Sequence, residues 1–274
     1  MKTILVPTDL SSNANNALAF ADSIAKSQKA KIVLLYVYVP TIGKYNSISG
    51  LIAEEIVTAK KQALRKMEKI AEKYISGKYS IAIEVHDPVD TILAEAKKIK
   101  ADLIIMGTHG ATGLKKLLFG SNTAKVIAHA KTPVLAVPQR YRAQKIKNVI
   151  CTSDLNDLAK EIKAITPITK ALKAKTEVVY MEYVKDHTLV ATDKFKAIAK
   201  KAKLKNITFT EKKVSESVKL TDAIKNYVNK NKATIFAIFP EEKSFAEKWI
   251  FGSKTETLAY GLKIPMLSIR RSQL

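Results

Sequence analysis

Short apolar segments alternate with amphipathic segments over the first 140 residues. Five apolar segments have the length of buried strands, at residues 3–8, 31–39, 80–85, 103–106 and 133–137. Between them, apolar residues recur at helical spacing over residues 17–25, 51–75, 89–98 and 122–129. Strands and helices that alternate in this way predict a doubly wound α/β domain around a five-stranded parallel sheet.

The same order of segments begins again near residue 148. Residues 148–155 are similar to residues 3–10, and residues 177–181 are similar to residues 33–37. From Thr234 onward the two halves match without a gap at an offset of 132 residues. A repeat of this length predicts two tandem flavodoxin-like or Rossmann-like domains, at residues 1–140 and 146–274.

The composition is that of a globular protein with a strong basic excess. The net charge of +22 is spread over both halves, and five of the 47 basic residues are arginine. Because base readout favours the fixed fork of arginine, we expect no specific nucleic-acid partner, although weak attraction to polyanions remains. No apolar run approaches the ~20 residues of a membrane helix, so we expect no membrane contact and a cytoplasmic location.

A glycine-rich stretch follows the strand expected at residues 103–106. Gly107 and Gly110 flank two residues, and Gly120-Ser121 opens the next helix, in the pattern G-x2-G-x9-G-S. Such a turn can direct several backbone N–H groups and a helix N-terminus into one small space, which predicts an anion site. The alternative is an ordinary strand-to-helix loop in which the glycines only relieve backbone strain. The stretch is neither a Walker A loop nor a G-x-G-x-x-G fingerprint.

This pattern resembles the nucleotide-binding branch of the universal stress protein family, and the whole chain is similar to a tandem member of it. The resemblance implies a stress-response protein that binds ATP, AMP or ADP, with or without magnesium, and acts through nucleotide-dependent conformation or partner binding. It also implies that the last strands of the two halves, residues 134–137 and 266–269, pair within the chain. A further homodimer stays open.

The resemblance also assigns site residues. Contacts with the base and ribose are expected at Pro7, Thr8, Asp9, Val37 and Met106, and contacts with the ribose and phosphates at Gly107, Gly110, Gly120 and Ser121. His109, which falls inside the loop, and Asn122 and Thr123 complete the expected binding residues. Four of them have a structural alternative: Asp9 suits a helix N-cap or an Asx turn, Val37 and Met106 suit core packing, and His109 suits an ordinary loop. We expect no metal held by side chains, because the histidines lack zinc-site spacing and Cys151 is the single cysteine.

The second half departs from the pattern at its centre. At the constant offset, Gly107 becomes Phe239 and Gly110 becomes Glu242, while Pro240 removes an N–H donor. We therefore expect one nucleotide per chain, in the first half. The chain shows no motif for a catalytic nucleophile, so no catalytic residue is assigned. The alternative functions are slow ATP hydrolysis and adenylate transfer on the same fold.

Overall fold

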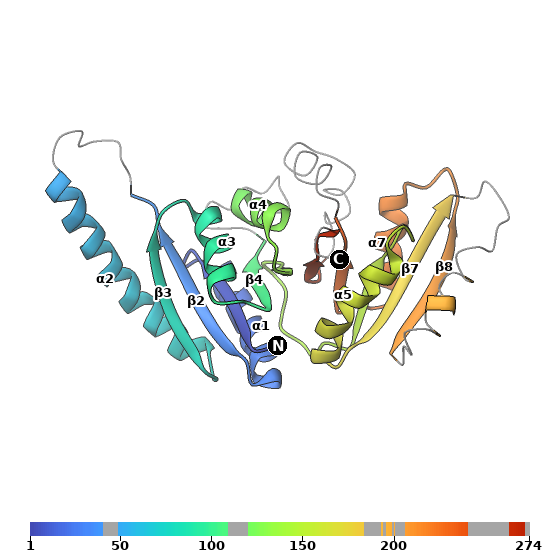
Figure 1. The fold of residues 1–274 in the computed structure, drawn as a ribbon, viewed down its shortest axis with the longest axis horizontal. Coiled ribbons are helices and arrows are strands. Elements are labelled where there is room, and N and C mark those ends of the chain that lie inside the picture. The colour runs from blue at the N-terminus through green and yellow to red at the C-terminus, as the bar shows by residue number, and fades with distance from the viewer. Residues whose placement is uncertain are drawn as a thin grey trace. The chain divides into compact units, whose positions relative to one another are not determined.

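The protein folds as two compact units, Met1–Ala143 and Gln144–Leu274, called unit 1 and unit 2 below. The computed structural model describes residues 1–40, 49–108, 120–183, 193, 196–198, 200, 206–240 and 263–271. Figure 1 shows each unit as a sheet with helices packed against it. The expected pairing of the last strands between the two halves stays a prediction.

Unit 1 is a doubly wound parallel sheet with strand order β3-β2-β1-β4-β5. The elements in chain order are β1 (Thr3–Thr8), α1 (Ser12–Gln28), β2 (Lys31–Tyr38), α2 (Ser49–Tyr74), β3 (Tyr79–Val85), α3 (Pro88–Lys98), β4 (Leu103–Gly107), α4 (Ser121–His129) and β5 (Val134–Val137). The chain winds outward from β1 to β3 and then returns to the other side of β1 with β4. Ligands of such sheets bind where this reversal occurs, at the carboxyl ends of β1 and β4.

Helices cover both faces of this sheet. Helix α1 contacts α2, and α3 contacts α4, so each pair forms one layer. The central strands are accordingly apolar on both sides, and Leu5, Leu34 and Ile104 are fully buried. The amphipathic spacing in the sequence reflects this arrangement, because each helix buries one stripe against the sheet.

The helices of unit 1 begin in different ways. The Ser11 side chain caps α1 by accepting a hydrogen bond from the Ala14 N–H, and Asp87 caps α3 in the same manner. Helix α4 instead starts at Gly120, which has no side chain to offer as an acceptor. The first N–H groups of α4 therefore lack the side-chain acceptor that the other two helices have.

Unit 2 repeats the topology of unit 1. Its elements are β6 (Asn148–Thr152), α5 (Leu158–Ala171), β7 (Lys175–Tyr183), β8 (Ile207–Val214), α7 (Leu220–Lys230), β9 (Ile235–Ile238) and β10 (Met266–Ser268). The strand order β8-β7-β6-β9-β10 corresponds strand for strand to that of unit 1, and the pairs between neighbours are parallel. The predicted fold class, two doubly wound α/β sheets, is confirmed.

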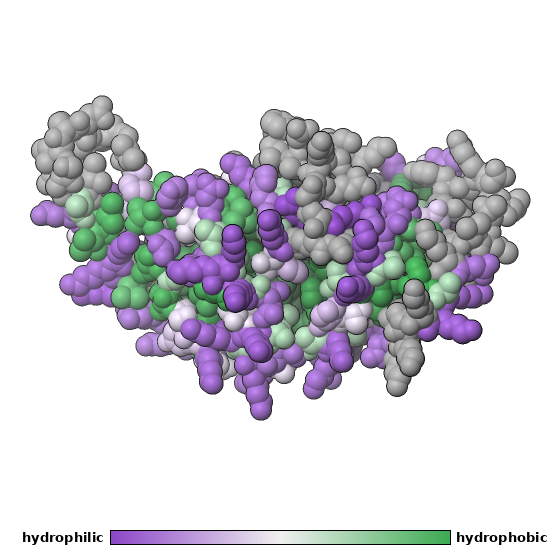
Figure 2. All heavy atoms as spheres, in the orientation of Figure 1, coloured by the Kyte–Doolittle hydropathy of each residue, from purple (hydrophilic) through white to green (hydrophobic). Residues whose placement is uncertain are grey.

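Hydrophilic residues account for much of the visible surface. Figure 2 shows hydrophilic residues along the edge at which the strands begin, at the bottom of the view. Four exposed lysines that follow helices, Lys29, Lys100, Lys173 and Lys232, belong to the turns that lead into strands. None of the helices in the described part of the chain is both long and apolar enough to cross a membrane.

Candidate nucleotide pocket

A pocket of about 470 Å³ lies at the carboxyl ends of β1, β2 and β4 in unit 1. Ten of the twelve residues expected at the site line it: Pro7, Thr8, Asp9, Val37, Met106, Gly107, Gly120, Ser121, Asn122 and Thr123. The other two, His109 and Gly110, fall outside the described residues. The fold thus brings residues from three strands and one helix to a single concave surface.

Sequence reasoning missed the other side of this pocket. Strand β2 and helix α3 add lining residues that no motif marks: Leu35, Tyr36, Tyr38, Val39, Pro88 and Ile92. The only sequence signal that could have found them is their position. Strand β2 ends beside β1, and α3 begins after β3 and packs on the sheet. The Tyr38 hydroxyl donates a hydrogen bond of 2.7 Å to Glu55 on α2, and this bond raises the pKa of Tyr38.

The end of β1 is a tight turn stabilised by its own side chains. Thr8 Oγ1 accepts a hydrogen bond from the Leu10 N–H, and Asp9 Oδ1 accepts one from the Ser11 N–H, each at 3.0 Å. Leu10 has a φ of 65°, in the left-handed region. Asp9 therefore forms the Asx turn that was the structural alternative for it, and its exposed carboxylate also lines the pocket.

Hydrogen bonds join the end of β4 to the start of α4. Thr123 Oγ1 donates to the carbonyl of Gly107 at 2.8 Å, and the Gly120 N–H donates to the carbonyl of Thr108 at 2.5 Å. These two bonds hold together the ends of the segment 109–119. The amino end of α4 is consequently fixed beside the end of β4.

Gly107 has a packing reason to be glycine. A Cβ at this position would lie 2.6 Å from Asn13 Nδ2 and 3.2 Å from the Asn13 backbone oxygen. Asn13 is 2% exposed on α1, so it has little room to move away. The strand-to-helix turn therefore needs glycine at 107 even without a phosphate, because of this close packing rather than backbone strain.

The pocket presents three kinds of chemistry. Asp9 is the one charged side chain among its described lining residues, whereas the wall from β2 and α3 is largely apolar. The amino end of α4 supplies N–H groups and the positive end of a helix dipole. A ligand with a flat apolar part, hydroxyl donors and an anionic group would match all three.

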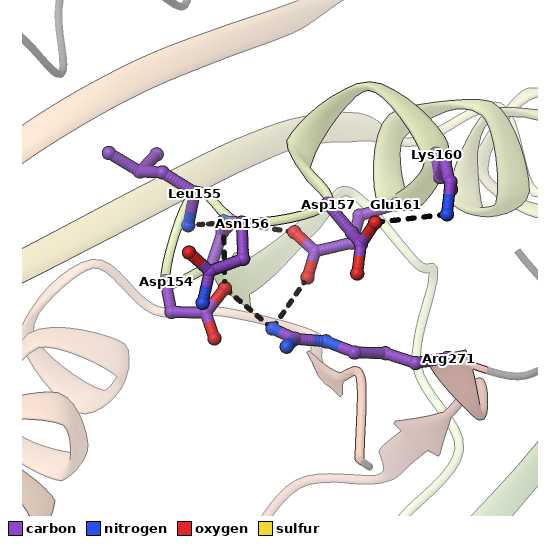
Figure 3. Close-up of polar contacts among 8 residues, drawn as sticks. Asp154, Leu155, Asn156, Asp157, Lys160, Glu161 and Arg271 are labelled. Atoms are coloured by element: carbon purple, nitrogen blue, oxygen red, sulfur yellow. Dashed lines mark hydrogen bonds and ion pairs between the residues drawn. The ribbon is translucent and has the colours of Figure 1, made fainter.

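In unit 2 the corresponding turn has an ion pair. Ser153, Asp154 and Leu155 follow Thr8, Asp9 and Leu10 by 145 residues and form the same two hydrogen bonds. Figure 3 shows Arg271 reaching both Asp154 and Glu161. Its Nη2 lies 2.6 Å from Asp154 Oδ1 and 3.1 Å from Glu161 Oε1.

The pKa values of the two carboxylates that contact Arg271 are shifted in opposite directions. Burial raises the pKa of Glu161, and the hydrogen bond from Ser153 and the charge of Arg271 only partly offset that effect. Burial also acts to raise the pKa of Asp154, but hydrogen bonds from Arg271 and from the Asn156 N–H outweigh it and lower this pKa. The difference follows from exposure, because the side chain of Glu161 is 2% exposed and that of Asp154 is 46% exposed.

Comparison with known proteins places the chain in a family. The model of the universal stress protein family matches residues 1–138. The chain belongs to the universal stress protein family. In Methanocaldococcus jannaschii, universal stress protein MJ0531 is 36% identical over 149 residues, which cover 50% of this chain and 81% of the relative. Universal stress protein MJ0577 of the same organism is 32% identical over 155 residues, covering 51% and 96%.

A solved structure extends the similarity in fold to the whole chain. The crystal structure of a universal stress protein from Archaeoglobus fulgidus has a TM-score of 0.70 and covers 98% of this chain and 96% of its own. At 20% sequence identity, this similarity concerns the fold alone. The family model matches only residues 1–138, so the similarity in fold of the second half is shown by this structure.

Proposed function

We propose that unit 1 binds one adenine nucleotide, ATP, ADP or AMP, in the pocket at the ends of β1, β2 and β4. The chain would then act in a stress response through nucleotide-dependent conformation or partner binding. The observation that carries this proposal is the convergence of Asp9, the apolar β2 wall and the amino end of α4 on one pocket. Its volume of about 470 Å³ lies within the usual range for small-molecule sites.

The charges of the pocket orient the nucleotide. Phosphates belong at the amino end of α4, because the N–H groups of the first turn and the helix dipole favour an anion there. The Asp9 carboxylate would repel phosphates but can accept hydrogen bonds from ribose hydroxyls. The base then lies against the apolar wall that includes Val37 and Ile92.

The same geometry favours binding over catalysis. Hydrolysis needs a group that activates water near the terminal phosphate, whereas the one charged side chain of the described lining is assigned to the ribose. A magnesium ion would be held chiefly by phosphate oxygens and water.

The test is the identity and the site of the bound nucleotide. Mass spectrometry of the denatured, freshly purified protein should reveal an adenine nucleotide. In calorimetric titration with ATP, Asp9→Asn should lower the affinity by tenfold or more, since a charge-assisted hydrogen bond contributes about 1.5–3 kcal/mol. Asparagine can keep the Asx turn, so the fold should persist.

The repeat supplies the matched control. Asp154→Asn makes the same change at the corresponding position of unit 2 and should leave ATP affinity unchanged. If ATP does not bind the parent protein, or if Asp9→Asn binds it as tightly as the parent, the proposed site is wrong.

A further inference from the structure

The corner of unit 2 that corresponds to Asp9 is occupied by a side chain of the protein itself. Leu10 and Leu155 have φ angles of 65° and 68°, and the hydrogen bonds around Asp9 and Asp154 agree in partners and length. The two aspartates therefore occupy the same place in their units. Asp9 faces a pocket, whereas Asp154 is ion-paired with Arg271.

Arg271 is held in place by its backbone as well as its side chain. Its N–H donates a hydrogen bond of 3.0 Å to the carbonyl of Pro240, just beyond the end of β9. The side chain is 14% exposed, so most of it is covered. Arg271 follows β10 in the chain, and its guanidinium contacts Asp154 in the connection between β6 and α5.

The two residues that form the contact between Arg271 and Glu161 differ from the residues at the corresponding positions of unit 1. Glu161 follows Asn16 by 145 residues, and Arg271 follows Gln139 by 132 residues, the offsets of their respective segments. In unit 1, Asn16 Nδ2 donates to the backbone carbonyl of Pro138 at 3.1 Å and contacts that of Gln139 at 3.5 Å. In each unit the first helix thus contacts the residues that follow the last strand. This contact is made by an amide side chain in unit 1 and by an ion pair in unit 2.

A second pair of corresponding positions also differs between the two units. The close pair Asn13 and Gly107 of unit 1 corresponds to Leu158 and Phe239 in unit 2, which are 1% and 8% exposed. Apolar side chains thus fill the place where unit 1 needs a glycine at the edge of its pocket.

We propose that Arg271 is the internal ligand of unit 2. Its guanidinium neutralises Asp154 and Glu161 and fastens the residues after β10 to the start of α5. Unit 2 therefore keeps its folded state without a nucleotide. The statement about nucleotide rests on the proposed function of unit 1, but the role of Arg271 in unit 2 does not.

Cys151 provides a native reporter for this proposal. It is the only cysteine of the chain, it lies on β6 with 1% exposure, and burial raises the pKa of its thiol. A thiol reagent can reach it only when unit 2 opens, because the thiolate is the reactive form and the thiol is covered. The rate of Cys151 labelling by a maleimide therefore measures the opening of unit 2.

The experiment is a double-mutant cycle on the full chain without nucleotide. Arg271→Gln leaves the Glu161 carboxylate buried without its cation, so the labelling rate should rise at least tenfold and the unfolding midpoint of unit 2 should fall by roughly 5 °C. The double variant Glu161→Asn with Arg271→Gln recreates the pair found in unit 1. It should recover most of both losses.

The control is Lys163→Gln, which removes one positive charge at an exposed position of α5 in the same unit and should leave the labelling rate near that of the parent. If Arg271→Gln does not fold, the recovery of folded protein in the double variant with Glu161→Asn supports the proposal in the same way. A parental labelling rate in Arg271→Gln, or a double variant no better than the single one, would overturn the proposal.

Nucleotide is added last, and its effects separate the two proposals. Saturating ATP should not slow Cys151 labelling in the parent protein, and slower labelling would contradict the independence of unit 2. If ATP does not bind at all, the proposed function of unit 1 fails, whereas the mutant cycle at Arg271 keeps its meaning.

Discussion

Lysine takes the place of glycine at the ends of several helices in this chain. Lys29, Lys100, Lys173 and Lys232 have φ angles of 48° to 54°, the left-handed conformation that usually favours glycine. Each is followed by an alanine whose N–H bonds a carbonyl five residues earlier, as in a Schellman motif. These turns could not be predicted from the sequence, because the signal for such a helix end is normally glycine and the chain has only nine glycines.

These lysines should carry a measurable backbone cost. Replacing Lys29 by glycine relieves a left-handed conformation that costs about 1–2 kcal/mol, and loses part of that gain to the greater freedom of glycine in the unfolded chain. We expect Lys29→Gly to stabilise unit 1 by about 0.5 kcal/mol in urea unfolding. Lys26→Gly, within the last turn of the same helix, should instead destabilise it by about 1 kcal/mol. A loss of stability in both variants would show that the left-handed turn is not under strain.

At the scale of elements, the hydrophobic pattern was a good guide to type and order. The strand predicted at residues 31–39 is Lys31–Tyr38, and the helix predicted at 51–75 is Ser49–Tyr74. The period of apolar residues depends on local geometry, which is why it could be read from the sequence. The contact of Arg271 with Glu161 could not, because 110 residues separate them and no local pattern relates them.

The fit of β4 against α1 is the element contact that most constrains the pocket. Gly107→Ala would place a methyl group 2.6 Å from the side chain of the buried Asn13, so strand and helix must separate or Asn13 must shift. We expect a loss of about 1–2 kcal/mol in the unfolding free energy of unit 1. Gly77→Ala is the matched control, because a Cβ at Gly77 would meet nothing within 4 Å. Equal stability of the two variants would mean that the close contact at Gly107 is absent in solution.

For the whole molecule, the central question is what two units of one fold do in one chain. Unit 1 has a pocket with a carboxylate and a helix N-terminus. In unit 2, Arg271 is ion-paired with the corresponding carboxylate, Asp154, and the buried Phe239 stands at the position of Gly107. Among the described residues, the halves therefore differ at this sheet edge: Asp9 lines a pocket, whereas Asp154 is covered by Arg271. The sequence indicated this difference through Phe239 and Glu242, of which Glu242 lies outside the described residues.

This difference predicts one nucleotide per chain and two unfolding transitions that respond differently to it. At an ATP concentration of 100 times the Kd, binding stabilises the folded unit by about 2.7 kcal/mol, which corresponds to a shift of roughly 10 °C for a unit of this size. Scanning calorimetry with and without ATP should therefore move the transition of unit 1 upward. The transition of unit 2, recognised because Arg271→Gln lowers it, should stay in place.

Isothermal titration of the same samples gives the stoichiometry. It should be close to one, because Phe239 stands where Gly107 lines the pocket and Arg271 covers the carboxylate that would meet the ribose. Running the titration at about 50 and about 200 mM salt separates this site from attraction to the net charge of +22, since contacts of that kind with a polyanion can lose ~10³-fold over the range. Two equivalent sites per chain, or ATP binding that weakens with salt as steeply as that of a random DNA duplex, would contradict a single nucleotide pocket in unit 1.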